Sequence, residues 1–109
     1  MKISDTPFGT TEWDAVEATE HAGESGTATW RTRRFGDVRV RRVEYSPGYR
    51  ADHWCAKGHI LLCLEGSLET ELRDGRVFTL QAGVSYQVAD GVDEHRSSTE
   101  TGATLFIVD

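Results

Sequence analysis

The sequence predicts a single all-β domain, built as a sandwich or barrel of strands. From residue 27 onward, short runs rich in threonine, valine and aromatic residues alternate with turn residues, at intervals of about eight to twelve that are typical of these folds. Nothing in this region has the apolar period of a helix. At 109 residues, with 38% hydrophobic content, the chain has the size and composition of one ordinary globular domain.

The first two strands are expected over residues 27–33 and 38–45, which are rich in β-branched and aromatic side chains. Phe35-Gly36-Asp37 between them is typical of a hairpin turn. Six of the twelve basic residues lie between Arg31 and Arg42. They fit the solvated outer face of two strands, or include one or two arginines that point inward and bind an anionic substrate. Residues 39–44 do not alternate cleanly, so the inward arginine is not identified.

The second half of the chain shows clearer alternation. Leu68, Thr70 and Leu72 alternate with charged residues, which predicts a strand with one exposed face. Asp74-Gly75 is a strong hairpin signal, and residues 76–80 form the return strand. Two more strands are expected, over 84–88 and 103–108, with a loop over 89–94 between them.

Residues 1–26 are polar and are expected to form an N-terminal arm that precedes a β-domain over 27–109. Residues 11–16 allow a short helical turn, and residues 23–26 are loop by composition. His21 is expected to be a solvated loop residue, with contact to a pocket rim or a partner subunit as the alternative. Because the arm lacks a core of its own and could cover a sheet edge, a homodimer is expected.

Charge and composition exclude several classes of partner. The formal net charge of −6 disfavours nucleic acid, and no apolar run approaches the length of a membrane span. The first seven residues have no apolar segment of the secretory kind. Two cysteines without such a segment favour a reducing, cytoplasmic location over a disulfide scaffold.

The segment from Asp52 to Gly66 carries the candidate chemistry. His53, Cys55 and His59 are separated by even steps, so an extended chain would place all three on one face. Imidazole and thiolate groups that converge in this way are ligands for a transition metal. The alternative is a metal-free polar pocket in which the histidines form hydrogen bonds and Cys55 is a small core residue.

This segment resembles the first cupin motif, in which Gly, His-x-His, Glu and Gly recur at set spacings. Pro47-Gly48 leads into it; His53 matches the first histidine, Cys55 the second histidine, and His59 the glutamate, before the closing Gly66. Residues 83–91 have the outline of the second motif, followed by His95 one residue late. Asp52-His53-Trp54-Cys55 and residues 102–109 are similar to the bacterial DHCW-motif cupin fold proteins, which have no settled activity.

The resemblance implies a jelly-roll β-barrel with His53, Cys55, His59 and His95 converging in its mouth. This set favours one divalent ion of iron, zinc, nickel or copper over magnesium or calcium. Asp52 is expected to be a partner of a metal ligand or a turn residue. Tyr86 and Gln87 are neighbours on one strand, so one of them should face the cavity, and Gln87 is preferred.

Trp54 is expected in the core or at a dimer interface, and Cys63, within an apolar run, in the core. Two functions remain open. One is a metal-dependent enzyme acting on a small organic molecule as an oxygenase, isomerase or lyase; the other is a metal-free module that binds or senses a small molecule. Less favoured are a metal-stabilised structural protein and a hydrolase with Cys55 as nucleophile and His53 as base.

Overall fold

The structure is a computed structural model that describes residues 2–109, and it consists almost entirely of strands. One short 3-10 helix, η1 (Trp13–Ala15), precedes the strands. The strands are β1 (Ala18–Ala22), β2 (Thr27–Phe35), β3 (Val38–Tyr45), β4 (His59–Leu72), β5 (Val77–Gln81), β6 (Ser85–Val88), β7 (His95–Ser98) and β8 (Ala103–Val108). The predicted all-β class is confirmed.

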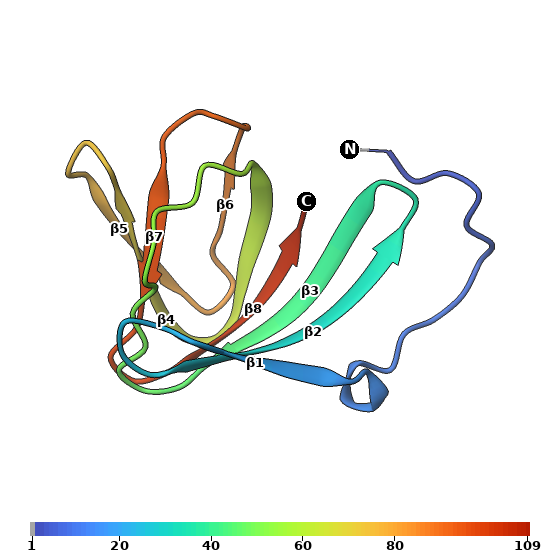
Figure 1. Ribbon diagram of the computed structural model, residues 1–109, viewed down its shortest axis with the longest axis horizontal. Helices are drawn as coiled ribbons and strands as arrows, with labels where there is room; N and C mark the ends of the chain where they lie inside the picture. Colours follow the sequence, from blue (N-terminus) through green and yellow to red (C-terminus); the bar gives the residue numbers. More distant parts are fainter. Residues whose placement is uncertain (1) are drawn as a thin grey trace.

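Two antiparallel sheets share strand β4. The first half of β4 pairs with β6 and β8, in a sheet that continues through β3 and β2 to β1 at the edge. The second half of β4 pairs with β5 and β7. The pairing of β4 with β8 is irregular between Cys63 and Glu65, and β4 changes sheets between Gly66 and Ser67. In Figure 1 the two sheets diverge, with β5 and β7 on one side and β2, β3 and β8 on the other.

The hydrophobic core lies between the inner faces of the two sheets. It is formed by buried residues from six segments: Ala28, Val43, Tyr49, Leu61, Cys63, Leu68, Leu80, Ala103, Leu105 and Ile107. Cys63 is completely buried among them, as its place in an apolar run predicts. These contacts close one end of the space between the sheets, and the other end holds the polar residues described below.

Strand β3 explains why the arginine-rich segment was ambiguous in sequence. Val43 belongs to the core and Tyr45 packs against it, so the period of two places Arg41 on the same inner face. Val38 and Val40 face the opposite side, yet both are buried as well. A strand that is buried on both faces has no simple alternation of polar and apolar residues.

The N-terminal segment is not entirely loop. Strand β1 pairs with β2 in antiparallel register, from Ala18 opposite Arg31 to Ala22 opposite Thr27, so residues 18–22 extend the sheet. The helical turn expected over 11–16 is present as η1. Residues 2–11 have no regular structure, and they carry two exposed apolar side chains, Ile3 and Phe8. Within residues 2–109 no helix has the length and apolar character to cross a membrane.

The segment before β4 is not the extended strand that the even spacing of His53, Cys55 and His59 assumed. The chain bends at residues 52–53, and β4 begins only at His59. Cys55 forms an isolated bridge with His95 instead of continuing a strand. The assumption of one shared strand face was therefore wrong, and each of the three side chains is placed by a different local geometry.

Glycine at residue 66 is required where β4 passes close to the last turn. Gly66 has a φ of 78°, and a Cβ added there would lie 2.1 Å from the carbonyl oxygen of Gly102. Gly75, in the hairpin between β4 and β5, has a φ of 100°, but the space that a Cβ would occupy there is open. The two positions share the left-handed backbone and differ in the backbone contact.

We expect Gly66→Ala to lower the free energy of unfolding by about 3 kcal/mol or more, since it combines left-handed strain with a clash against backbone. Gly75→Ala is the matched control and should cost only the strain, about 1–2 kcal/mol. Denaturant unfolding of both variants measures the difference. Equal losses would show that the approach of Gly66 to Gly102 is not a constraint on the fold.

Candidate functional site

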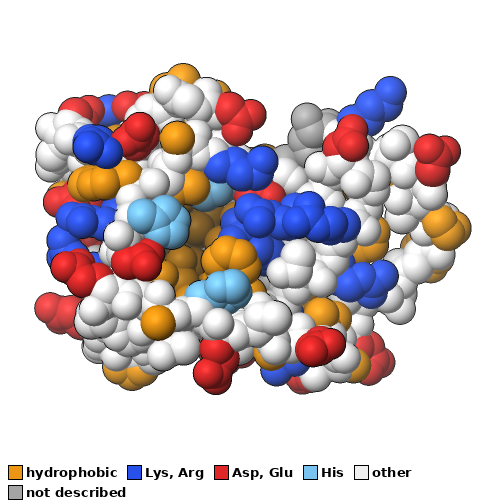
Figure 2. All heavy atoms as spheres, in the orientation of Figure 1, with side chains coloured by type: hydrophobic (Ala, Val, Ile, Leu, Met, Phe, Trp, Pro, Cys, Tyr) orange, Lys and Arg blue, Asp and Glu red, His pale blue; other side chains and the backbone are white. Residues whose placement is uncertain are grey.

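A cavity of about 210 Å³ lies between the two sheets, beside the hydrophobic core. Figure 2 shows it as a central hollow with an apolar floor and with histidine, lysine and arginine side chains around it. Its lining comes from β2, β3, β4, β6, β7, β8 and the loop before β4: Trp30, Arg39, Arg41, Tyr45, Tyr49, Ala51, His53, Cys55, Lys57, His59, Leu61, Tyr86, His95, Arg96, Ser97, Ile107 and Asp109.

Strand register aligns the inner wall of this cavity in rows. Arg41 lies opposite Ile107, Ile107 opposite Leu61, and Leu61 opposite Tyr86, which forms one row across β3, β8, β4 and β6. The next row, toward the open end, begins with Arg39, whose backbone exchanges two hydrogen bonds with Asp109. Continuing the same register places His59 beside Asp109. Residues from four strands therefore meet because of pairing that is distant in sequence.

His59 is the first of two buried imidazoles in the cavity. Its Nε2 atom lies 2.8 Å from the hydroxyl of Tyr86, while its Nδ1 is buried with no hydrogen-bond partner. Burial lowers the pKa of His59 to about 4, and His95 and Arg41 add to this effect. The ring is therefore neutral at pH 7. When Nε2–H donates to the Tyr86 oxygen, Nδ1 keeps a free lone pair.

His95 faces His59 from the opposite sheet. It begins β7, and its ring centroid lies 4.8 Å from that of His59. Its Nδ1 lies 3.0 Å from the backbone carbonyl oxygen of Asp93, and its Nε2 is buried without a partner. Because a carbonyl only accepts, Nδ1 carries the proton in the neutral ring and Nε2 has the lone pair. Each histidine thus has one anchored nitrogen and one unused nitrogen.

Cys55 is held directly opposite His95. The backbone N–H groups of the two residues donate to each other's carbonyl oxygens at 2.8 and 3.0 Å. Side-chain contact with His95 lowers the pKa of the Cys55 thiol, and the same contact raises the pKa of His95. The side chains of Cys55 and His95 are near each other, but His95 Nε2 has no hydrogen-bond partner. Both shifts make it easier for the thiol to lose its proton beside the imidazole.

His53 lies at the rim of the cavity and not with the other candidate ligands. Its side chain is 76% exposed, and its Nδ1 is 2.6 Å from a carboxylate oxygen of Asp52. Asp52 is therefore placed to orient His53. Within residues 2–109, no three histidine, cysteine, aspartate or glutamate side chains stand close enough together to hold a metal ion.

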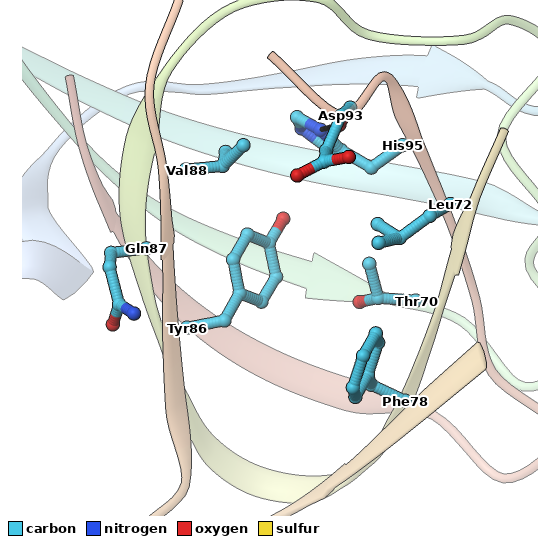
Figure 3. A pocket seen from close by; sticks show the side chains of 8 residues that line it. All are labelled: Thr70, Leu72, Phe78, Tyr86, Gln87, Val88, Asp93 and His95. Carbon is cyan, nitrogen blue, oxygen red and sulfur yellow. Dashed lines mark hydrogen bonds between the residues drawn. The ribbon is translucent and has the colours of Figure 1, made fainter. Parts of the chain in front are cut away.

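A second cavity of about 200 Å³ adjoins the first, with Tyr86 and His95 lining both. Figure 3 shows Tyr86 pointing inward, with its hydroxyl directed toward Asp93 and His95, and Gln87 pointing away. Gln87 is exposed, so the preference for it as the cavity residue was wrong and Tyr86 takes that place. Opposite Tyr86, the hydroxyl of Thr70 is buried without a partner.

The cationic wall of the first cavity is the part that sequence reasoning left undecided. Arg39 donates to both carboxylate oxygens of Asp109, at 2.9 and 2.8 Å, and Arg41 reaches one of them at 3.2 Å. The Arg41 guanidinium also stacks on Trp30, 4.5 Å from the ring centroid. Burial acts to raise the pKa of Asp109, but the two arginines hold it below its usual value.

Trp54 lies outside this wall, against Arg96 of β7 and Arg73, which follows the end of β4. The guanidinium of Arg96 is 4.5 Å from its ring centroid and that of Arg73 is 5.5 Å away. Arg96 is held in turn by Glu71 at 2.7 Å. Trp54 is half-buried in this stack, and it fastens the loop that carries Cys55 to strands β4 and β7.

The lowered pKa of His59 predicts that the stability of the chelator-treated protein is sensitive to acid. The unfolded chain binds this proton with a pKa near the ordinary value of about 6.5, so stability falls as the pH drops from there toward about 4. Between pH 7 and pH 5 the contribution amounts to at most about 2 kcal/mol. Denaturant unfolding in chelator, comparing the parent chain with His59→Gln, measures it. A variant as acid-sensitive as the parent would contradict the assignment to His59.

Comparison with known proteins gives matches in structure only. No protein-family profile matches the sequence, and no curated protein matches it. An RmlC-like cupin from Shewanella frigidimarina has a TM-score of 0.71 and 18% identity over 96% of this chain and 88% of its own. Ectoine synthase from P. lautus has a TM-score of 0.73 and 12% identity over 93% and 76%, respectively.

A cupin-superfamily sugar phosphate isomerase from Silicibacter pomeroyi has a TM-score of 0.71 and 14% identity, and the match covers 92% of this chain and 74% of that one. At such sequence identities these proteins are evidence for the fold of this chain, and the activities in their names are not evidence for its activity. Their common fold agrees with the two antiparallel sheets of this chain. The chain has the jelly-roll barrel fold of the cupin superfamily.

Proposed function

We propose that this small cupin binds a small organic molecule in the cavity between its sheets, beside one divalent transition metal ion held by His59, His95 and Cys55. The observation that carries the proposal is the pair of buried imidazoles with unused nitrogens, His59 Nδ1 and His95 Nε2, on facing sheets. A buried polar atom without a partner is costly, and a metal ion would satisfy both.

The surroundings of each ligand support this assignment. Metal-bound histidines usually have their second nitrogen held by a hydrogen bond, as Tyr86 and the Asp93 carbonyl do here. The lowered pKa of Cys55 favours the thiolate that a metal requires. Nitrogen and sulfur donors select iron, zinc, nickel or copper. Side-chain rotation must bring the three groups together, and His53 at the rim is a fourth ligand only if it turns inward.

An ion held by three protein ligands keeps an open position for water or substrate, where it would act as a Lewis acid or bind oxygen. The chain's own part is to hold the ligand in the cavity and to exclude bulk water with the half-buried Tyr45 and Tyr86. Oxygenase, isomerase and lyase reactions are the classes to screen. Both cysteines are free thiols, in keeping with our proposal of a cytoplasmic location.

One observation favours a second candidate, a metal-free binding or sensing module. The cavity wall contains one carboxylate, Asp109, against four cationic side chains: Arg39, Arg41, Lys57 and Arg96. An excess of positive charge near His59 disfavours a second cation in the same space. In this alternative the unused imidazole nitrogens form hydrogen bonds to the small molecule itself.

Elemental mass spectrometry of the purified, untagged protein tests the metal directly. We expect close to one equivalent of iron, zinc, nickel or copper, and its loss in His59→Ala and His95→Ala. His21→Ala is the matched control, since His21 lies on the exposed edge strand β1. Retention of the metal in Cys55→Ser would show that Cys55 is a pocket residue and not a metal ligand. A parent protein without metal, even after reconstitution, would leave the metal-free module.

We also propose that two copies of the chain associate through the N-terminal segment. Strand β1 lies at the sheet edge with all five residues exposed, and an open edge invites pairing with another chain. Residues 2–11 carry Ile3 at 63% exposure and Phe8 at 98%. Apolar side chains this exposed on a segment without regular structure fit a contact with a second copy.

Sedimentation equilibrium measures the mass of the assembly. We expect a dimer for the parent chain. The dissociation constant of the dimer should be at least about tenfold larger for Phe8→Ser, because the substitution removes an apolar contact. Val92→Ser, which changes a 51% exposed residue in the loop before β7, serves as the control. A monomeric parent chain in dilute buffer would refute the dimer.

A further inference from the structure

Arg41 stands apart from the other arginines of this chain because it is buried and mostly unpaired. The residue is 7% exposed, and its Nε has no hydrogen-bond partner. A guanidinium has five N–H donors, and within residues 2–109 only Nη2 of Arg41 donates a hydrogen bond, at 3.2 Å to Asp109. Burying the remaining N–H groups of this guanidinium without hydrogen-bond acceptors costs free energy, so an acceptor from outside the chain would offset that cost.

The charge balance at this point leaves room for a single negative charge. Arg39 and Arg41 share the carboxylate of Asp109, so two positive charges and one negative charge leave one positive charge. Arg39 holds Asp109 in bidentate geometry, which leaves Arg41 with the weaker contact. Two other cations line the cavity: Lys57 is exposed at the rim, where solvent screens its charge, and Arg96 is neutralised by its ion pair with Glu71. A monoanion neutralises this cluster, whereas a dianion would leave excess negative charge beside Asp109.

The rest of the cavity is suited to an apolar body. Leu61 and Ile107 form the floor next to Arg41, and the stacked rings of Tyr45 and Tyr49, with centroids 4.1 Å apart, line the neighbouring wall. The volume of about 210 Å³ is smaller than the roughly 300 Å³ or more of pockets for drug-sized ligands. The ligand must therefore be small, with an apolar part attached directly to its charged group.

We propose that the cavity binds a small monocarboxylic acid with a compact apolar body, its carboxylate held by Arg41 and its body resting on Leu61, Ile107 and the tyrosine pair. The inference rests on the proposed function for the location of the ligand site, but not on the metal. A carboxylate accepts two parallel hydrogen bonds from a guanidinium, and this geometry cannot be reproduced by a neutral amide.

Calorimetric titration of chelator-treated protein with benzoate, benzamide and inorganic phosphate tests the ligand class. We expect benzoate to bind, and benzamide and phosphate to bind at least about tenfold more weakly, which corresponds to losing a charge-assisted pair. Equal affinity for benzoate and benzamide, a preference for phosphate, or no heat from benzoate, acetate or isobutyrate up to about 10 mM would overturn the proposal.

Two variants of Arg41, with Arg34→Gln as the control, assign the contact to Arg41. Arg41→Gln should weaken benzoate binding at least about tenfold, while Arg34→Gln, which changes an exposed arginine on β2, should leave it unchanged. Arg41→Lys keeps the positive charge but loses the planar guanidinium, so it should bind benzoate more weakly than the parent chain. If Arg41→Gln does not fold, Arg41→Lys takes its place in the test. Benzoate affinity equal to the parent's in the folded variant would overturn the assignment.

This outcome is separable from that of the metal proposal. Elemental analysis measures the metal content without any organic acid present, and the titration measures the affinity for the acid after the metal has been removed by chelator. Binding of benzoate to a chain that never holds metal would sink the metal proposal and leave this inference standing. A chain that holds one equivalent of metal but binds none of benzoate, acetate and isobutyrate would support the metal proposal and overturn this inference.

Discussion

The structure depends on one strand that belongs to two sheets. The first half of β4 pairs with β6 and β8, and its second half pairs with β5 and β7, so its backbone bonds hold both sheets together. The change of sheet occurs next to Gly66, where the backbone approaches Gly102 too closely for a side chain. If β4 continued straight in one sheet, β7 would not face β3 and β8, and no cavity would form between them.

The candidate site is a consequence of that geometry. His59 starts β4 in the first sheet and His95 starts β7 in the second, so they meet only because β4 joins the sheets. Arg41 and Asp109 arrive from β3 and from the end of β8, in neighbouring rows of the same wall. One cavity therefore combines two imidazoles, each with an unpartnered nitrogen, and an incompletely paired guanidinium, which are the groups on which our two proposals rest.

Local sequence patterns predicted most of the architecture. The Asp74-Gly75 hairpin, the strand over 103–108 and the loop before His95 are all present, because turn residues and the period of two act over short distances. Strand β1 was not anticipated, since its five residues are all exposed and show no alternation. The bend at residues 52–53 was also missed, and even spacing alone could not show that the chain is not extended there.

The sequence by itself determined the fold class and a short set of candidate residues that includes Cys55, His59 and His95. The fold class follows from periodicity and turn chemistry, which are properties of neighbouring residues, whereas the candidate residues follow from their spacing and from the resemblance to the cupin motifs. Only the tertiary structure decided that His53 stays at the rim and that Arg41 is buried beside Asp109. Those positions follow from strand register and sheet packing, in which residues up to 70 positions apart in the chain form hydrogen bonds, and no local pattern encodes such pairings.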